Sequence, residues 1–412
     1  MDKTITDIKA REIFDSRGNP TIEITMTSDP YTASCAVPSG ASTGSYEALE
    51  LRDGNAGYYS GKGVLQAIHH IDTIISPALR GAKLGNQSQI DQVLQELDST
   101  QNKSHLGANA LLAVSMVYAK LSAASMEIEL HEYIRQLLDL ERSTTYTPHI
   151  FANIINGGAH APHSTTIQEF HIVPMHETIS EKLSAIHMFQ NHLKDHLIEH
   201  GSCALGIGDE GGYVISNKSS TEVLDMLHNI KAGMRIGGQI AFALDIAANE
   251  FLHDSYYHID GQHLKPSLYE DMIQDMIKSY HIFAVEDPFA EHEFAAFARL
   301  QAKDRDTIVV GDDLVATNAN RLQKAIESKS VGGVIIKPNQ IGTLSETLTV
   351  IRIAKQNNIK CIASHRSGET NDTFIVDLAW GAQCFGMKLG ALQRGERVAK
   401  YNRLRAISEQ QS

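Results

Sequence analysis

Charged side chains stand at the ends of several short apolar runs in the second half of the chain. The acids among them are Asp245 after IAFAL, Glu286 after IFAV and Asp312 after TIVVG. Carboxylate oxygens are the ligands that Mg²⁺ prefers, and carboxylates gathered without a cation would repel one another. The pattern therefore predicts a magnesium site, although any one of these acids, taken singly, could instead cap a following helix.

Basic side chains end three further apolar runs. Lys337 follows GVII, His365 and Arg366 follow KCIAS, and Lys388 follows CFGM. Because Pro338 disfavours a helical conformation for the residue before it, Lys337 is expected to stay extended at a strand end. Beside Lys388 and a metal ion its ammonium would be destabilised, so we expect a lowered pKa and a role as general base.

These runs are short and rich in β-forming residues, and helical patterns separate them. Alternation of this kind predicts an α/β fold with parallel strands crossed over by helices, as in a (β/α) barrel, whose strand C-termini open onto one face. Residues 5–37 instead alternate apolar and polar, which predicts a three-stranded antiparallel meander. Helical periodicity follows near 63–79, 88–97 and 108–124. We expect an N-terminal α+β domain over 1–140 and a barrel over 141–412.

Composition narrows the class of protein. The chain has 412 residues, a net charge of −13 and a pI near 5.8, which disfavour nucleic acid or an acidic membrane as the main partner. Its four cysteines are widely spaced and form no CxxC pair, as expected for thiols in a reducing compartment. The first residues do not resemble a signal peptide, and no apolar run approaches the ~20 residues of a membrane span. We expect a cytoplasmic location.

Glycine-rich segments present further polar side chains. GIGDEGGY holds Asp209 and Glu210 between glycines, and INGGAHA presents His160. SGASTG, over 39–44, is a hydroxyl-rich loop that could bind a second metal or close over a ligand. Ordinary turns would explain each of these loops taken alone. A stripe of His192, His196 and His200 at four-residue spacing could bind metal, but a solvated helix face is the preferred interpretation.

The chain resembles the enolase (phosphopyruvate hydratase) family over nearly its whole length. The motifs that carry the resemblance are FDSRGNPT, VPSGASTGSYEALELRDG, LGANALLAVS, NIINGGAHA, QEF, GDEGGY, ALDIAANEF, VEDP, GDDLVATN, IIKPNQIGTLSET, ASHRSGET and RVAKYN. The resemblance implies an N-terminal α+β domain joined to a modified eight-stranded barrel. It also implies the reversible dehydration of 2-phospho-D-glycerate to phosphoenolpyruvate in glycolysis and gluconeogenesis, and a homodimer or a larger homo-oligomer.

The resemblance assigns a role to each matching residue. Lys337 would be the base that removes the C2 proton, and Glu210 the acid that assists loss of the C3 hydroxyl. Two Mg²⁺ ions would be bound, the first by Asp245, Glu286 and Asp312, and the second, recruited with substrate, by Ser42. The substrate would be held by Arg366 and Ser367 at its phosphate and by Lys388 near its carboxylate. The pocket would be lined by His160, Gln168, Glu169 and His365.

Some segments depart from the family pattern. Pro162 and His163 follow His160 in the closing loop, Leu389 follows Lys388 where threonine is usual, and the stretch after VEDP lacks the customary acids and tryptophan. These departures motivate an alternative, a paralog that acts on a related phosphorylated or phosphonate carboxylic acid. A binding protein without catalysis is a further alternative, which the complete set of catalytic residue types disfavours.

Overall fold

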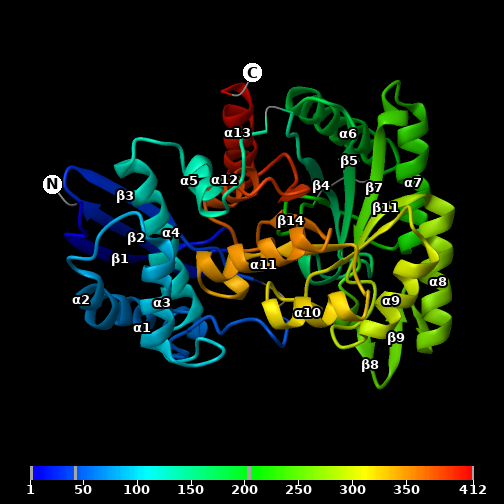
Figure 1. Ribbon diagram of the computed structural model, residues 1–412. Coiled ribbons are helices and arrows are strands. Elements are labelled where there is room, and N and C mark those ends of the chain that lie inside the picture. The colour runs from blue at the N-terminus through cyan, green and yellow to red at the C-terminus, as the bar shows by residue number, and fades with distance from the viewer. Residues whose placement is uncertain (1–2, 41–43, 144, 202–205, 411–412) are drawn as a thin grey trace.

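The chain folds into two units that lie side by side (Figure 1). A computed structural model describes residues 3–40, 44–143, 145–201 and 206–410. The N-terminal unit carries a sheet covered by helices, and the C-terminal unit is a barrel surrounded by helices.

The N-terminal unit begins with the predicted antiparallel meander. Its strands β1, β2 and β3 pair in chain order, and helices follow. The bounds are β1 Asp7–Phe14, β2 Pro20–Ser28, β3 Tyr31–Ala36, α1 Leu65–His70, a π-helical turn Ile71–Ile75, α2 Ser76–Leu79, α3 Gln87–Asp98, α4 Ala108–Ser125 and α5 Leu130–Leu137. The three expected helical segments are confirmed, and α5 is a helix that the sequence analysis did not predict.

Helix α4 forms the core of the N-terminal unit. Alanine, leucine and valine make it apolar on all sides, and nearly all of its residues are buried against β2 and β3. No single described helix is long and apolar enough to cross a membrane. Helices α4 and α5 meet that criterion only as a pair, with a bend of 105° between them.

The C-terminal unit is a closed barrel. Its wall runs β15, β14, β13, β12, β11, β7, β5 and β4, and a further pairing between β15 and β4 closes it. The bounds are β4 His149–Asn156, β5 Glu169–Pro174, β7 Ile240–Asp245, β11 Ile282–Glu286, β12 Ile308–Gly311, β13 Gly333–Ile336, β14 Lys360–Ser364 and β15 Gly386–Gly390. The barrel expected from the sequence is therefore confirmed.

The six runs expected to be parallel strands form β7 and β11 to β15 and are parallel, whereas the further strand β5 is reversed. β5 pairs antiparallel with both of its neighbours, β4 and β7, whereas the other neighbouring pairs of the wall are parallel. The connection from β4 to β5, 157–168, contains no α-helix, and the chain returns as a hairpin. Because β5 is reversed, its first residue, Glu169, lies opposite Asp245 at the C-terminal mouth of the barrel.

Helices surround the barrel, and further short strands lie outside its wall (Figure 1). Local sequence fixes several helix starts: Thr178 with Glu181 and Ser219 with Glu222 form capping boxes at α6 and α7. The bounds are α6 Ile179–Glu199, β6 Tyr213–Val214, α7 Ser220–Gly233, β8 Leu252–His253, β9 Tyr256–Ile259, β10 Gln262–Leu264, α8 Pro266–Tyr280, α9 Phe294–Lys303, α10 Ala319–Glu327, α11 Leu344–Gln356, α12 Phe374–Gly381 and α13 Gly395–Glu409.

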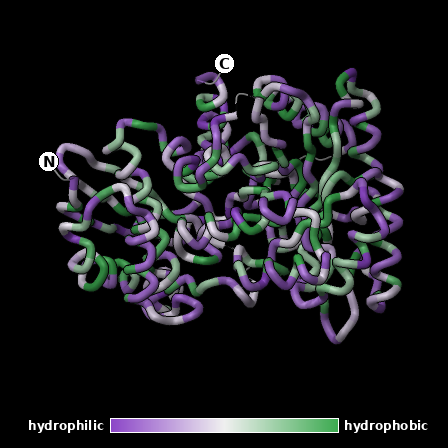
Figure 2. The backbone as a smooth tube through the Cα atoms, in the orientation of Figure 1, coloured by the Kyte–Doolittle hydropathy of each residue, from purple (hydrophilic) through white to green (hydrophobic). Residues whose placement is uncertain are grey.

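Apolar side chains fill the interior of the barrel below the mouth. They form a cluster of Phe151, Val173, Ala243, Ala284, Ile308, Val310, Ile335 and Ile362. In Figure 2, hydrophobic residues (green) are frequent along the barrel strands, whereas polar and apolar residues alternate along the outer helices. A filled interior leaves only the mouth for a ligand, as is usual in such barrels.

His149, at the start of β4, makes stability depend on pH. Its ring packs against Phe283 and Phe385, and burial, with repulsion from Lys182 and Lys360, lowers its pKa from 6.5 to about 4. As the pH falls, the unfolded chain takes up this proton before the folded chain does, so stability drops between those two values. His149→Phe keeps the ring contacts and should flatten the pH dependence of the free energy of unfolding in that window, measured by urea titration.

The matched control is His292→Gln, which changes an exposed imidazole. It should leave the slope unchanged. An equal slope for His149→Phe and the unmodified chain would contradict this account.

Candidate active site

The predicted chemical residues meet at the mouth of the barrel. One polar cleft is lined by eleven of them: His160, Gln168, Glu169, Glu210, Asp245, Asp312, Lys337, His365, Arg366, Ser367 and Lys388. Glu286 lies against the same cluster through its contact with Lys388. Ser42, the predicted ligand of a second metal, lies outside the described residues.

Lys388 is the centre of the acidic part of the site. Its ammonium Nζ lies 2.7 Å from Asp245 Oδ2 and 3.0 Å from both Glu286 Oε2 and Glu169 Oε1. Burial alone would lower the pKa of Lys388, but attraction to these three carboxylates outweighs it and raises the pKa well above its ordinary value. Lys388 is therefore a fixed cation that holds the ends of four strands together.

Lys337 departs from the expected pKa. It follows β13, and its ammonium contacts Asp312 Oδ2. Burial lowers the pKa of Lys337, but the charge of Asp312 more than compensates, so the pKa is raised rather than lowered. The expectation erred because repulsion from Lys388 is weaker than attraction to a carboxylate in direct contact. Gln340 orients this carboxylate by donating from Nε2 to Asp312 Oδ1 at 2.9 Å.

Glu169 and Glu210 form a buried pair of carboxyl groups whose pKa values are shifted in opposite directions. Burial and the nearby charge of Glu210 raise the pKa of Glu169 well above its ordinary value. For Glu210, burial is opposed by His365, whose Nε2 lies 3.0 Å from Glu210 Oε2, and the pKa falls well below the ordinary value. Glu169 therefore takes up a proton more readily than Glu210 does.

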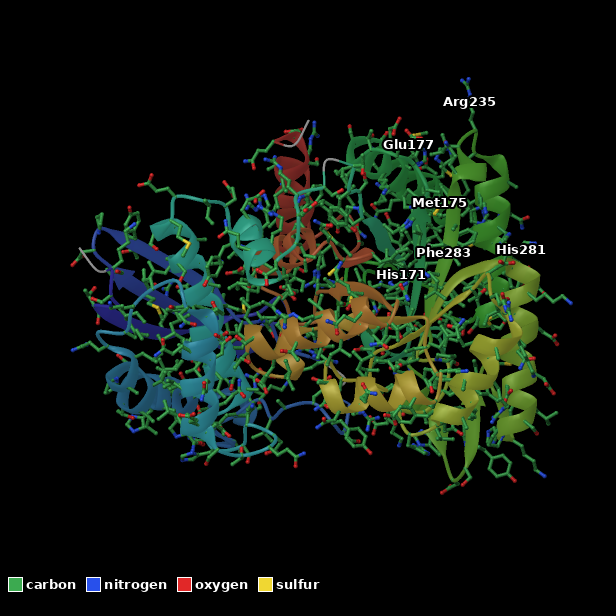
Figure 3. The ribbon with its side chains drawn as sticks, viewed as in Figure 1. His171, Met175, Glu177, Arg235, His281 and Phe283 are labelled. Atoms are coloured by element: carbon green, nitrogen blue, oxygen red, sulfur yellow. The ribbon has the colours of Figure 1, made fainter. Side chains whose placement is uncertain are left out.

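Amide and imidazole groups surround this pair. Asn153 Nδ2 donates to Glu169 Oε2 at 2.9 Å and to Glu210 Oε2 at 3.1 Å, and His171 Nε2 lies 2.9 Å from Glu169 Oε2. Burial lowers the pKa of His171 to about 3, so its ring is neutral. Figure 3 shows His171 and Phe283 among the barrel strands, whereas Arg235 extends away from the molecule.

Several polar atoms of cleft-lining residues are buried without a hydrogen-bond partner among the described residues, and two of them bear on ligand binding. They are His160 Nδ1 and the amide oxygen Gln168 Oε1, one a possible donor and the other an acceptor. A buried polar atom without a partner costs free energy, so such atoms mark places where a polar ligand would be stabilised.

One acid of the N-terminal unit pairs with a residue that lines the cleft. Glu47 forms a two-pronged ion pair with Arg366, with 2.9 Å between Nη1 and Oε2 and 3.1 Å between Nη2 and Oε1. Arg366 also donates to Asn339 Oδ1 at 3.1 Å. A planar guanidinium held in this way suits a phosphate or carboxylate ligand. Glu47 lies within the motif VPSGASTGSYEALELRDG, but its contact with Arg366 arises only from the docking of the two units.

Arg397, on α13, is a second residue that the sequence analysis did not single out. It is fully buried, and its Nη1 donates to His365 Nδ1 at 2.6 Å and to the carbonyl oxygen of Arg366 at 2.6 Å. Its Nη2 donates to the Ser367 carbonyl at 2.7 Å and the Asp209 carbonyl at 3.1 Å. With Nδ1 accepting, the proton of a neutral His365 is on Nε2, which faces Glu210.

The donor set at the mouth suits a hard divalent cation. Asp245, Glu286 and Asp312 offer only carboxylate oxygens, and the ammonium of Lys388 shows that positive charge is stabilised there. Asp287 and Asp313 bring further acids, and their ligand oxygens and that of Asp312 lie within 4.8 Å of one another. Asp245 and Glu286 belong to no equally compact group among the described residues. The residues present therefore fit a divalent metal ion. In this structure the ammonium of Lys388 is the cation next to two of the predicted metal ligands, Asp245 and Glu286.

Together, the fold and the cleft define a two-domain barrel enzyme with a buried acid–base site at the C-terminal mouth. The model for the N-terminal domain of enolase matches residues 5–134, and that for the enolase C-terminal TIM barrel domain matches 144–412. A protein named Enolase from Methanocaldococcus jannaschii is 43% identical over 409 residues, which cover 98% of this chain and 95% of the relative.

Two further curated relatives are similar over the same extent. Enolase from Corynebacterium kroppenstedtii is 42% identical, covering 98% of this chain and 95% of its own length. Enolase 1 from Entamoeba histolytica is 41% identical, covering 99% of this chain and 96% of its own length. The chain belongs to the enolase family, whose activity, phosphopyruvate hydratase, is that of a lyase.

Removal of the central cation tests the electrostatic account of the site. Lys388→Met would leave Asp245, Glu286 and Glu169 buried without their shared counterion, and breaking such a buried network costs about 3–5 kcal/mol. The expected result is a large loss of thermal stability in EDTA, which added Mg²⁺ partly restores. Calorimetry with and without metal measures both effects.

The control is Lys182→Met. Lys182 is also buried, but its ammonium donates to the Pro148 carbonyl and contacts none of these acids. Its loss of stability should not respond to Mg²⁺. If Mg²⁺ stabilised the two variants equally, the assigned role of Lys388 would be wrong.

Proposed function

We propose that this chain catalyses the reversible dehydration of 2-phospho-D-glycerate to phosphoenolpyruvate, a step of glycolysis and gluconeogenesis. The observation that carries the proposal is the presence of a lysine, a buried pair of carboxyl groups and an arginine fork around one buried cleft. The reaction needs a base for C2, an acid for the C3 hydroxyl and cations for the phosphate and carboxylate. The cleft offers each of these.

Asp245, Glu286 and Asp312 are proposed to hold Mg²⁺, and Ser42 a second ion that arrives with substrate. Mg²⁺ bound there would neutralise substrate carboxylate oxygens and stabilise the negative charge that develops when the C2 proton leaves. The C2 proton is weakly acidic because its removal adds a second negative charge to an existing anion. Buried, water-poor surroundings strengthen every such attraction.

Lys337 is proposed to accept the C2 proton through Nζ. It can do so only as a neutral amine, and in this structure Asp312 stabilises its ammonium form. If Asp312 bound a metal cation, its attraction for the Lys337 ammonium would weaken. The pKa of Lys337 would then fall toward the value that a general base needs. Thr317 Oγ1 accepts a hydrogen bond from the Lys337 amide at 2.9 Å and fixes the backbone that carries the base.

Glu210 is proposed to deliver a proton to the departing C3 hydroxyl. Glu169, the more readily protonated of the two, would supply this proton, and its carboxyl group shares the Asn153 amide with that of Glu210. As negative charge develops on the leaving oxygen, Glu210 becomes the better proton carrier of the pair. Asn153 contacts both carboxyl groups and keeps them in place during the transfer.

The remaining residues are proposed to bind the substrate. Arg366 and Ser367 would hold the phosphate, and Lys388 would lie near the substrate carboxylate. His160, Gln168 and His365 would line the pocket, and His160 Nδ1 and Gln168 Oε1, which lack hydrogen-bond partners, would bind substrate oxygens and hydroxyls. We further propose the division at 140/141, a cytoplasmic location and a homo-oligomer, a dimer or larger, on the strength of the family similarity.

The first test is absorbance at the enol double bond after 2-phosphoglycerate is added with Mg²⁺. A rapid rise that excess EDTA abolishes is the expected result. If no rise occurred, a related phosphorylated or phosphonate carboxylic acid would become the better substrate candidate. Parallel turnover measurements with such analogues would distinguish the two activities.

Two variants separate the proposed base from the proposed acid. Lys337→Ala should lower exchange of the C2 proton with deuterated water by about 10²–10⁴-fold, because it removes the proton acceptor. Glu210→Gln should slow dehydration while C2 exchange continues. NMR follows exchange, and absorbance follows dehydration. Near-normal values for both variants would contradict the assigned roles.

A further inference from the structure

Three histidines gather on a small sheet outside the catalytic mouth. The sheet consists of β8, β9 and β10, in the order β10–β9–β8, and lies at the lower edge of the barrel in Figure 1. It carries His253 on β8, His258 on β9 and His263 on β10. Nothing in the proposed reaction uses these residues.

Strand register places the three imidazoles on one face. His258 pairs directly with His263, and His253 pairs with Tyr256, two residues before His258. Side chains two residues apart on a strand point to the same side, so all three rings share the outer face. The ring centroids of His258 and His263 lie 4.2 Å apart, and those of His253 and His258 lie 5.6 Å apart.

Tight turns fix this register. Asp254 and Ser255 join β8 to β9 with φ of 50° and 66°, and Asp260 and Gly261 join β9 to β10 with φ of 49° and 76°. Two-residue turns with both central residues at positive φ match the twist of paired strands. A one-residue slip, which would turn one imidazole to the other face, is therefore disfavoured.

The opposite face anchors the sheet. Tyr257 is buried, stacks on Tyr269 with 3.9 Å between ring centroids, and contacts Glu293 through its hydroxyl. The outer face thus has a rigid base. In the described part of the chain, the ring nitrogens of the three histidines have no hydrogen-bond or ion-pair partner, so their lone pairs are available.

We propose that His258 and His263 form a surface binding site for a divalent transition-metal ion, with His253 as a third ligand after rotation of its ring. Neutral imidazole nitrogen suits Cu²⁺, Ni²⁺ and Zn²⁺, whereas Mg²⁺ prefers oxygen. The site is therefore chemically distinct from the acidic mouth. A bound ion would cross-link the adjacent strands β9 and β10 and thereby stabilise the sheet.

Copper binding in the presence of excess Mg²⁺ tests the proposal, because Mg²⁺ would compete with Cu²⁺ for carboxylate oxygens but not for imidazole. A second neighbouring pair, His196 and His200 on the end of α6, has ring centroids 4.0 Å apart and could also bind copper. The experiment therefore starts from the His196→Gln/His200→Gln protein. Calorimetry gives the affinity for Cu²⁺, and electron paramagnetic resonance gives the number of coordinated nitrogens.

Adding His258→Gln and His263→Gln to that background should weaken Cu²⁺ binding by well over about tenfold, since even outer-shell partners of metal ligands contribute that much. The nitrogen signature should disappear, while the circular dichroism spectrum stays unchanged. Adding His253→Gln instead should weaken binding less and remove one nitrogen. Unchanged affinity and nitrogen signal after loss of His258 and His263 would overturn the proposal, and an unchanged nitrogen count in the His253 variant would overturn the third ligand.

Discussion

Burial of like charges at one end of a barrel is the constraint on which the rest of this structure depends. Asp245, Glu286 and Glu169 come from three different strands, and only the ammonium of Lys388, from a fourth, brings them within 3.0 Å of a common atom. Without a cation their mutual repulsion would force the strand ends apart or neutralise the acids. The same demand for positive charge that stabilises the fold is what equips the mouth to bind metal and an anionic substrate.

Arginines extend this logic to the loops. Arg397 donates hydrogen bonds to the backbone carbonyls of Arg366 and Asp209 and so fixes the loops that carry the site. Glu47, from the N-terminal unit, holds the guanidinium of Arg366. The cleft itself is lined by the C-terminal unit, and the N-terminal unit contributes Glu47 as the partner of Arg366. Opposite pKa shifts of Glu169 and Glu210 follow from this arrangement, because His365 faces only one of the two carboxyl groups.

Much of the site was predictable from the sequence, because a strand end is a local feature. A short apolar run followed by a charged residue identifies Asp245, Asp312 and Lys388 without knowledge of the rest of the chain. The reversal of β5 was not predictable in this way, since strand direction depends on the connection and not on the composition of the strand. Glu47 and Arg397 lie in the motifs VPSGASTGSYEALELRDG and RVAKYN, but they reach the site through docking and helix packing, which residue patterns alone do not predict. The raised pKa of Lys337 depends on a contact with Asp312 that only the folded barrel creates.

The reversed strand β5 also bears on how the cleft can change. In an ordinary β/α unit, the loop above a strand leads to an outer helix, so an altered loop must still deliver the chain to the helix start. Here 157–168 leave the wall at Asn156 and re-enter it at Glu169, neighbours in the same ladder. Insertions or exchanges in this loop can therefore be absorbed at its tip, with both stems held by the wall. The segment is a natural place to graft new recognition elements while the acids below stay in position.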